Sequence, residues 1–320
     1  MQARIARRHV PENHWPRIAV MGAGAVGCYF GGMLARAGAP VTLIGRPHRV
    51  EAIARQGLYI DSPQFHERIA ISASPNAGAA GDAGLVLFCV KSFDTEEAAK
   101  SLAAHLAPGA AVLSMQNGVD NADRIRSATG IAAIPAVVYV AVSMTAPNRV
   151  RHSGRGDLVI GNPSGALDLT EIAALFVRAG IPCRISENIQ ADLWVKMIMN
   201  CAYNAISALA RSKYGRIVRN PWTRDLMRTV TREALHVARA AGVGLPDSEV
   251  TDAVLQLAEA MSEATSSTAQ DIARGSRTEV DALNGYLVRR GCELGVATPV
   301  NQTLFALVKL LEETARERLP

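Results

Sequence analysis

A glycine-rich segment near the start of the chain has the spacing of a phosphate-binding loop. Gly22, Gly24 and Gly27 form a G-x-G-x-x-G pattern directly after a short apolar run. In this pattern the first glycine makes a tight turn, the second lets the backbone approach a pyrophosphate, and the third lets a helix lie close to the strand. The N–H groups that open the helix then hold the anion. The alternative is a glycine turn without a ligand. The pattern predicts a dinucleotide site formed by Gly22, Ala23, Gly24, Ala25, Val26 and Gly27.

The end of the next expected strand indicates which dinucleotide the loop would bind. A protein that binds the free 2′-hydroxyl of NAD usually places Asp or Glu there, about 20 residues after the glycines. Here the run 41–44 is followed by Gly45 and Arg46, and no carboxylate occurs before Glu51. The fork of an arginine side chain suits a 2′-phosphate. We therefore expect Arg46 to favour NADPH, the alternative being an ordinary surface arginine at a strand end.

A polar stripe runs along an otherwise apolar segment in the second half of the chain. Between residues 191 and 210 the only charged residues are Asp192 and Lys196, and a helix that is apolar nearly all round is expected to be buried. Lys196, Asn200 and Asn204 are spaced four apart and share one face of that helix. Because burying these groups without partners would be costly, this face should line a polar cleft or a satisfied network. The alternative is a helix ion pair between Lys196 and Asp192.

Two groups nearer the C-terminus have a structural and a functional interpretation. Ser276 and Glu279 have the spacing of a capping box just before an apolar-periodic run, with Glu279 at the third helical position. Glu279 could equally be a carboxylate of the site, and the spacing alone does not separate these interpretations. Upstream, Ser266 and Ser267 could either cap a helix or bind a ligand carboxylate.

Lys91 and Asn117 each follow an expected strand. Lys91 comes after the apolar run 85–90, and Asn117 follows the run 111–115. Doubly wound folds bind ligands at the carboxyl ends of parallel strands, although a tight Asn-Gly turn and an ordinary strand-end lysine explain these residues equally well. No His pair, Cys/His cluster or G-x-S-x-G sequence occurs, so we expect neither a metal site nor a serine hydrolase.

The elements that must position these groups change in kind after about residue 186. The first half alternates short β-branched runs with helical patterns, which is typical of a parallel sheet covered on both faces. The second half has almost only helical patterns. We expect strands at 17–21, 41–44, 85–90, 111–115, 136–144 and 158–161, helices at 25–37, 94–106 and 167–179, and further helices at 189–210, 221–241, 248–264, 279–295 and 300–317.

These patterns divide the chain into three expected parts of an α/β protein. Residues 1–16 lack the apolar run of a signal peptide and are expected to be a flexible extension. Residues 17–187 are expected to form a doubly wound, Rossmann-type domain that binds NADP. Residues 188–320 are expected to form an all-α domain that carries the substrate and the catalytic groups.

The composition excludes several classes of protein. The chain of 320 residues is 49% hydrophobic and 20% charged, unlike a disordered or collagen-like protein. Its net charge of +5 is scattered, which argues against nucleic-acid binding but suits an anionic small ligand. The longest apolar stretch is too short to cross a bilayer, so we expect no membrane span. The five cysteines are far apart in apolar or small-residue surroundings, as in a reduced cytoplasmic protein.

Several separate motifs in one order resemble the ketopantoate reductase (2-dehydropantoate 2-reductase) family. The resemblance runs from about residue 17 to residue 313 and is far more specific than the glycine loop alone. It rests on the loop 22–27, Cys89-Val90-Lys91, Gln116-Asn117-Gly118, Leu193-Trp194-Val195-Lys196 with Asn200, Ser266-Ser267 with Gln270-Asp271, and the segment 277–285.

The resemblance implies a fold, a reaction and roles for residues. The fold is a Rossmann-type domain followed by an all-α domain like the C-terminal domain of 6-phosphogluconate dehydrogenase. The reaction is the NADPH-dependent reduction of 2-dehydropantoate to (R)-pantoate in pantothenate biosynthesis. By resemblance, Lys196 is the general acid, Glu279 holds the terminal hydroxyl of the substrate, and Ser267 contacts the substrate carboxylate. Asn200 and Asn204 position the substrate, and Asn117 contacts both cofactor and substrate. Arg46 binds the 2′-phosphate of the cofactor, and Lys91 lies beside the nicotinamide.

The chemistry of this reaction agrees with the residue types. Hydride added to a ketone carbon leaves negative charge on oxygen, which an ammonium group can stabilise and protonate. Burial should lower the pKa of Lys196 towards the working range. The alternatives are an NADPH-dependent reductase of another 2-oxo acid and a non-catalytic dinucleotide-binding sensor. The helical domain could also bury an apolar face against a second copy of the chain, so a homodimer is a further expectation.

Overall fold

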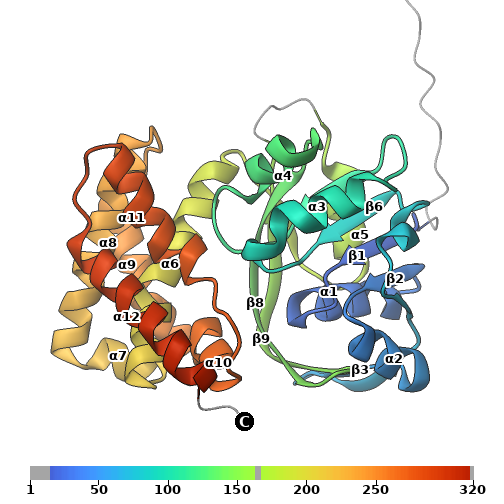
Figure 1. Cartoon of the computed structure of the whole chain (residues 1–320), viewed down its shortest axis with the longest axis horizontal. Coiled ribbons are helices and arrows are strands. Elements are labelled where there is room, and N and C mark those ends of the chain that lie inside the picture. Colours follow the sequence, from blue (N-terminus) through green and yellow to red (C-terminus); the bar gives the residue numbers. More distant parts are fainter. Residues whose placement is uncertain (1–14, 163–166, 318–320) are drawn as a thin grey trace, which may run out of the picture.

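The computed structural model describes residues 15–162 and 167–317. Within these ranges the chain forms a mixed α/β domain followed by an all-helical domain (Figure 1). The last strand of the first domain ends at Ile185, and the first helix of the second begins at Ile189. Of the expected extension 1–16, residues 1–14 lie outside the described residues, whereas Trp15 packs on the first domain beneath the guanidinium of Arg178.

The first domain is built on a ten-stranded mixed sheet in the described part of the chain. Its strands are β1 (Ile18–Met21), β2 (Val41–Ile44), β3 (Leu58–Asp61), β4 (His66–Ile69), β5 (Ser72–Ser74), β6 (Leu85–Phe88), β7 (Ala111–Ser114), β8 (Ile134–Ala146), β9 (Arg149–Ile160) and β10 (Cys183–Ile185). Their order is β4-β3-β9-β8-β7-β6-β1-β2-β5, and β10 pairs with β9. The part from β5 to the start of β8 is parallel, whereas β8 pairs antiparallel with β9.

Apolar cores lie on both faces of the parallel part. Val20 of β1 belongs to the core that contains Phe30, and the adjacent Ala19 belongs to the core that contains Leu102. Because successive strand residues point to opposite faces, the central strands β1 and β6 are apolar throughout. The covering helices are α1 (Ala25–Arg36), α2 (Pro47–Gln56), α3 (Thr95–Ala103), α4 (Asn121–Thr129) and α5 (Thr170–Arg178), with 3-10 turns η1 (Ala77–Ala80) and η2 (Ser92–Asp94).

The long hairpin β8–β9 departs from the parallel sheet that the sequence predicts. The pattern indicates separate strands at 136–144 and 158–161, but β9 already begins at Arg149 and pairs antiparallel with β8 over most of its length. The segment 149–157 of β9 contains four charged residues and two glycines, and the register shifts near Arg155 and Gly156, which have positive φ angles. A bulged, half-exposed strand of this kind lacks an apolar run, so its periodicity is weak.

The second domain is helical. Its elements are α6 (Ile189–Ala210), α7 (Tyr214–Arg219), α8 (Pro221–Ala240), α9 (Asp247–Ala260), α10 (Ser267–Ala273), the 3-10 turn η3 (Val280–Ala282), α11 (Asn284–Glu293) and α12 (Pro299–Glu317). The helix expected at 189–210 is confirmed. The start expected at residue 279 is wrong, because Glu279 precedes η3 and α11 begins only at Asn284. The carboxylate of Glu279 caps no helix, so the capping-box interpretation with Ser276 is also wrong.

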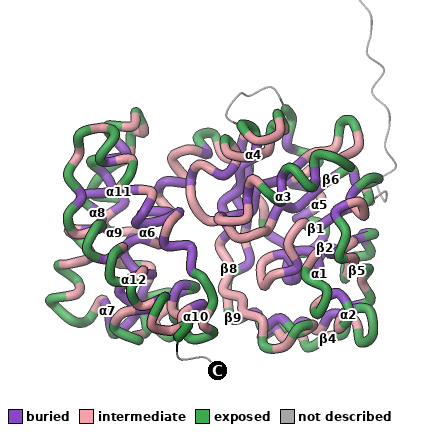
Figure 2. Tube along the Cα trace, viewed as in Figure 1, coloured by how far each residue is buried: buried purple, intermediate pink, exposed green. Residues whose placement is uncertain are grey.

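Helix α6 is the centre of the second domain and its link to the first. Met197, Cys201 and Tyr203 are buried in a core shared with α8, α9, α11 and α12, and the helix also packs on β8. Figure 2 shows that much of its length is buried. Asn188 accepts a hydrogen bond from the N–H of Ala191 and caps the helix where the chain leaves the first domain. The central position explains the nearly continuous apolar character of α6.

Replacing Gly27 by alanine should strongly destabilise the first domain. A Cβ atom there would lie 2.2 Å from the carbonyl oxygen of Gly22 and 2.8 Å from Cγ1 of Val20. We expect G27A to lose about 2–4 kcal/mol of unfolding free energy, measured by chemical denaturation. Gly24 is the matched control, because a Cβ there meets no atom within 4 Å, and G24A should stay within about 1 kcal/mol of the unmodified protein. Equal losses in the two variants would contradict this explanation.

Candidate active site

The glycine loop lies between β1 and α1, against the end of β6. Gly22 has a φ of +112°, and a Cβ there would lie 2.7 Å from the carbonyl carbon of Cys89, so only glycine fits. The space in front of Gly24, by contrast, is open. The N–H groups of residues 25–27 open α1 and have no acceptor in the described part of the chain. Unpaired N–H groups beside open space fit the phosphates of a dinucleotide.

Two arginines follow β2, one just before α2 and one in its first turn. Arg46 directly precedes α2, and its exposed side chain makes no hydrogen bond or ion pair with the described residues. Arg49 is partly buried and donates to the carbonyl oxygen of Ala23, 3.2 Å away. Burial lowers the pKa of Arg49, and the positive charges of Arg46 and Arg274 lower it further. The positive charge beside the loop suits an additional phosphate.

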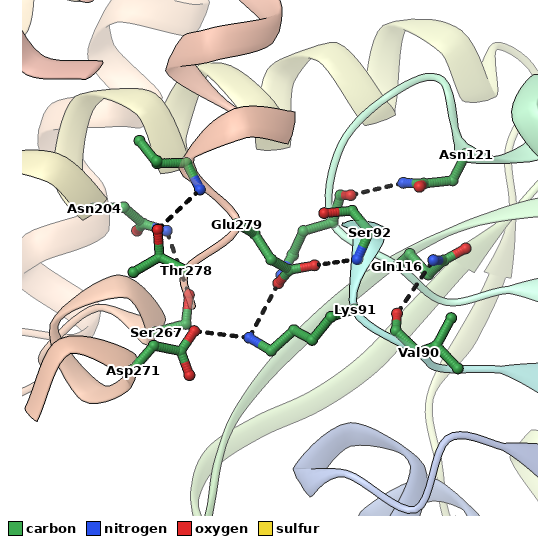
Figure 3. Close-up of polar contacts among 12 residues, drawn as sticks. Val90, Lys91, Ser92, Gln116, Asn121, Asn204, Ser267, Asp271, Thr278 and Glu279 are labelled. Carbon is green, nitrogen blue, oxygen red and sulfur yellow. Dashed lines mark hydrogen bonds and ion pairs between the residues drawn. The ribbon is translucent and has the colours of Figure 1, made fainter. Parts of the chain in front are cut away.

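Lys91 joins the two domains through a pair of carboxylates (Figure 3). Its Nζ atom lies 2.8 Å from Oδ2 of Asp271 and 3.3 Å from Oε2 of Glu279. Glu279 also accepts hydrogen bonds from the backbone N–H of Ser92 and from Nδ2 of Asn117, each over 3.0 Å. Strand-end residues of the first domain thus meet α10 and the segment that follows it. This contact explains why Glu279 does not cap a helix.

Burial and charge act in opposite directions in this cluster. Burial alone would raise the pKa of Glu279, but Lys91 and Asn117 hold it below its usual value. Burial would likewise lower the pKa of Lys91, which the carboxylates of Glu279 and Asp271 instead raise. The pKa of Asp271 is raised by its burial against the opposing effect of Lys91. Lys91 therefore stays an ammonium and Glu279 a carboxylate at neutral pH.

Lys196, on α6, occupies a different kind of environment. Its Nζ atom donates a hydrogen bond to the carbonyl oxygen of Val138 in β8 and lies 5.8 Å from the centre of the Tyr139 ring. Burial lowers the pKa of Lys196 to about 8, while the charge of Glu279 opposes this shift and that of Arg155 adds to it. Lys196 therefore holds its proton less tightly than an ordinary lysine does.

Asp192, one turn before Lys196, is engaged elsewhere. It accepts hydrogen bonds from the guanidinium of Arg184, over 2.9 Å, and from the hydroxyl of Ser186. These partners lie in and just after β10, so Asp192 ties the start of α6 to the first domain. The helix ion pair considered from the sequence is therefore wrong. Among the described carboxylates, none is in ion-pair contact with Lys196.

The rest of the polar stripe faces α10. Nδ2 of Asn204 lies 3.4 Å from Oγ of Ser267, and the buried Oδ1 of Asn204 has no partner in the described part of the chain (Figure 3). Asn200 makes no side-chain hydrogen bond with the described residues. Ser266 caps α10 by accepting from the N–H of Ala269, 3.0 Å away, and its hydroxyl also donates to the backbone carbonyl oxygen of Asn204 in α6, 3.2 Å away. The hydroxyl of Ser266 is therefore already engaged in holding α10 against α6. Amide groups without partners leave this face able to bind a polar ligand.

The structure brings Lys91, Asn117, Glu279 and Lys196 to the boundary between the two domains. No hydrogen bond or ion pair joins Arg46 or Asn200 to the other predicted site residues in the described part of the chain. The glycine loop abuts the end of β6, which leads directly into Lys91. Lys196 is close enough to Glu279 for the two charges to interact. Direct hydrogen bonds join predicted site residues in two separate clusters. In one cluster Lys91 and Asn117 bond Glu279. In the other, Asn204 bonds Ser267.

Three contributors were given no role by reasoning from the sequence, although Asp271 belongs to one of the motifs that carry the family resemblance. Asp271 lies one turn after Ser267 on α10, and Arg49 lies three residues after Arg46, so helical spacing was the available signal for both. The backbone N–H of Ser92 is the third, and a backbone donor leaves no mark on the residue type. Which backbone groups reach a site depends on how the loops are folded.

Other kinds of site receive no support from the described residues. In the ranges 15–162 and 167–317, no group of three or more His, Cys, Asp or Glu side chains could hold a metal ion. No helix in the described part is long and apolar enough to span a membrane. Burial raises the pKa of the Cys28 thiol to about 12 and also raises that of Cys201, so neither is a ready nucleophile.

Both domains match models of one protein family. Residues 18–165 match the family described as Ketopantoate reductase PanE/ApbA, and residues 188–312 match Ketopantoate reductase PanE/ApbA C terminal. A 2-dehydropantoate 2-reductase of Halobacterium salinarum is 35% identical over 305 residues, covering 92% of this chain and 99% of that protein. The enzyme of that name from Pyrobaculum aerophilum is 36% identical, covering 92% of this chain and 97% of that protein.

Solved structures agree with the family models. A PanE/ApbA family ketopantoate reductase from Ralstonia eutropha is 51% identical, with a TM-score of 0.87 and coverage of 94% of this chain and 99% of that one. A D-mandelate dehydrogenase in complex with NADH and anilino(oxo)acetate has a TM-score of 0.89 at 23% identity, over 93% of this chain and 99% of that one, which shows a shared fold alone. The predicted Rossmann-type domain with a helical C-terminal domain is confirmed. The chain belongs to the ketopantoate reductase family of oxidoreductases.

Proposed function

We propose that this protein reduces 2-dehydropantoate to (R)-pantoate with NADPH, and that Lys196 is the general acid. The observation that carries this proposal is the contrast between two lysines that interact with Glu279. Lys91 is held as a cation by two carboxylates, whereas burial lowers the pKa of Lys196 to about 8. Only Lys196 can release a proton readily near neutral pH. Relatives named 2-dehydropantoate 2-reductase support the choice of substrate.

In this proposal the first domain, residues 17–187, binds the cofactor. The N–H groups of residues 25–27 and the open space at Gly24 fit the pyrophosphate. The unpaired guanidinium of Arg46 fits the 2′-phosphate and supports NADPH rather than NADH. Lys91 and Asn117, at the ends of neighbouring strands, would border the nicotinamide. The bound nicotinamide supplies the hydride.

The helical domain, residues 188–320, would hold the 2-oxo acid. The hydroxyl of Ser267 suits the substrate carboxylate. The amides of Asn200 and Asn204 would position the substrate, and the unsatisfied Oδ1 of Asn204 supports this role because it needs a donor. Asn200 and Asn204 lie on the same side of α6 as Lys196. Ser267 lies on the neighbouring helix α10.

Glu279 would accept the terminal hydroxyl of the substrate. A carboxylate has about four acceptor positions, and here the donors are Lys91, the N–H of Ser92 and Asn117. A position on Oε1 therefore remains for a substrate hydroxyl. Because the pKa of Glu279 is held below its usual value despite burial, the group is an acceptor at neutral pH.

Lys196 would act on the oxygen that becomes negative when hydride adds to the 2-oxo carbon. Its ammonium can stabilise this charge and then donate a proton, leaving a neutral amine. The hydrogen bond to the carbonyl oxygen of Val138 orients the side chain. The charge of Glu279 favours the ammonium form without an ion-pair contact that would hold the proton more tightly.

The direct test is the oxidation of NADPH by the purified protein with 2-dehydropantoate, compared with NADH and with a panel of other 2-oxo acids. We expect the highest kcat/KM with NADPH and 2-dehydropantoate. A higher kcat/KM with another 2-oxo acid would mean that this acid is the substrate, while the proposed type of reaction would stand. Tight NADPH binding without turnover of any 2-oxo acid would overturn the proposed catalysis.

Lys196→Ala should greatly reduce turnover but leave cofactor binding intact. We expect kcat to fall by about 10²–10⁴-fold, the usual contribution of a general acid, with an unchanged Kd for NADPH in a fluorescence titration. In the unmodified protein, kcat for reduction should decline as the pH rises through about 8, because the ammonium form is lost. Normal turnover in K196A would refute the role of this lysine.

Arg46→Ala should weaken NADPH binding selectively. Loss of a charge-assisted contact to phosphate corresponds to about 10–100-fold in KM for NADPH, whereas KM for NADH should barely change. Arg55 is the matched control, because it is exposed on α2, the helix that Arg46 precedes, and pairs only with Glu51, 3.1 Å away, among the described carboxylates. If R46A weakened both cofactors equally, Arg46 would not read the 2′-phosphate.

Glu279→Ala should act mainly on substrate binding. Removing the acceptor of a substrate hydroxyl should raise KM for 2-dehydropantoate by about 10–100-fold, with a smaller change in kcat. Thermal unfolding of the same variant separates binding from stability. A lower Tm combined with an unchanged KM would indicate that Glu279 serves only to join the domains.

A further inference from the structure

A second buried carboxylate, that of Glu312 on helix α12, bonds the residue that precedes Glu279. Residues 276–283, here named the 276–283 connection, link α10 to α11 and carry Glu279. Oε1 of Glu312 accepts a hydrogen bond from the backbone N–H of Thr278, 2.7 Å away. Glu312 is 3% exposed and Thr278 is 0% exposed, so no bulk water can replace this acceptor.

The connection has little regular structure of its own. Its turns are held by bonds from the N–H of Ser276 to the carbonyl oxygen of Asp271 and from the N–H of Val280 to Oγ1 of Thr278. Between them, the N–H of Thr278 has Glu312 as its acceptor in the described part of the chain. The place of Thr278, and of the Glu279 that follows it, therefore depends on a group from another helix.

The connection also contacts the first domain, through the side chains of Glu279 and Arg277. Glu279 meets Lys91 and the N–H of Ser92 there, as Figure 3 shows. The guanidinium of Arg277 lies 4.6 Å from the centre of the Phe93 ring. Glu312 thus bonds the same segment that contacts the first domain.

Lys309 holds the second carboxylate oxygen of Glu312. Its Nζ atom lies 3.1 Å from Oε2 of Glu312 and 3.1 Å from Oδ2 of Asp281. Asp281 belongs to the connection and also pairs with Arg277 over 3.3 Å. Two residues of α12, one turn apart, therefore fasten the connection at two points.

We propose that Glu312 is a positioning residue for the reaction, acting through the N–H of Thr278 on the neighbouring carboxylate of Glu279. This inference rests on the proposed function, in which Glu279 binds the substrate hydroxyl. A displacement of about 1 Å of such a group can cost about 10²-fold in rate. Glu312 therefore contributes to substrate recognition without touching the substrate.

The kinetic test compares three variants on α12. Glu312→Ala removes the acceptor and should lower kcat/KM for 2-dehydropantoate about tenfold, chiefly through KM, with an unchanged Kd for NADPH. Glu312→Gln keeps an oxygen acceptor and should stay within about threefold of the unmodified protein. Glu313→Ala is the matched control, because this neighbour is exposed, and its kinetics should not change. Equal losses in E312Q and E312A would overturn the role of the hydrogen bond.

A double-mutant cycle tests whether the effect passes through Glu279. In the Glu279→Ala background, adding E312A should change kcat/KM by less than about twofold, because the group being positioned is already absent. The same tenfold loss in both backgrounds would overturn the proposal and show a general structural role. If E312A does not fold, Glu312→Asp withdraws the acceptor by one methylene, and an unchanged KM in E312D would likewise overturn it.

Amide hydrogen exchange of the 276–283 connection gives a readout that needs no activity. Exchange should be faster in E312A than in the unmodified protein, and unchanged in E312Q and E313A. Unchanged exchange in E312A would overturn the anchoring of Thr278 whatever the kinetics. If the unmodified protein reduced no 2-oxo acid while exchange behaved as expected, the proposed function alone would fail and the anchoring would stand.

Discussion

The ammonium of Lys91, placed between the carboxylates of Asp271 and Glu279, is the contact on which the relation of the two domains depends. Lys91 follows a strand of the first domain, and both carboxylates come from the second. The two carboxylates are largely buried, whereas 39% of the Lys91 side chain is exposed. A buried carboxylate is costly without a partner, so Asp271 and Glu279 need the ammonium of Lys91 in place. The contact therefore requires that α10 and the 276–283 connection lie against the strand ends, which also places the polar stripe of α6 beside the glycine-loop domain.

The same physics gives two lysines opposite properties. Lys91 has two carboxylates in contact, so its charge is stabilised despite burial. Lys196 has the carbonyl oxygen of Val138 and only the more distant charge of Glu279, so desolvation dominates and its pKa falls to about 8. One lysine is suited to hold structure and bind anions, and the other to exchange a proton. The β8–β9 hairpin contributes to this difference, because it supplies the carbonyl oxygen of Val138.

Much of the fold was predictable, because its signals are local. The glycine loop, the apolar strands of the parallel sheet and the long helix 189–210 each depend on spacing within about twenty residues. The antiparallel extension of β9 was not predictable, since its charged residues and its bulge at Arg155 and Gly156 hide the alternation. The predicted helix start at Glu279 failed because a capping box and a segment held by tertiary contacts can have the same sequence.

The sequence by itself determined the residue types and the local geometry that the site needs. It set Lys196, Asn200 and Asn204 on one helical face and arginine where an acidic residue would select NAD. Only the tertiary structure decided which groups meet. It separated Lys196 from Asp192, placed Asp271 and the N–H of Ser92 at the boundary, and brought Glu312 to the N–H of Thr278. The physical reason is that desolvation and ion pairing depend on distances in space. Lys91 and Glu279 are in contact although they are 188 residues apart in the chain. No local sequence pattern records such a distance.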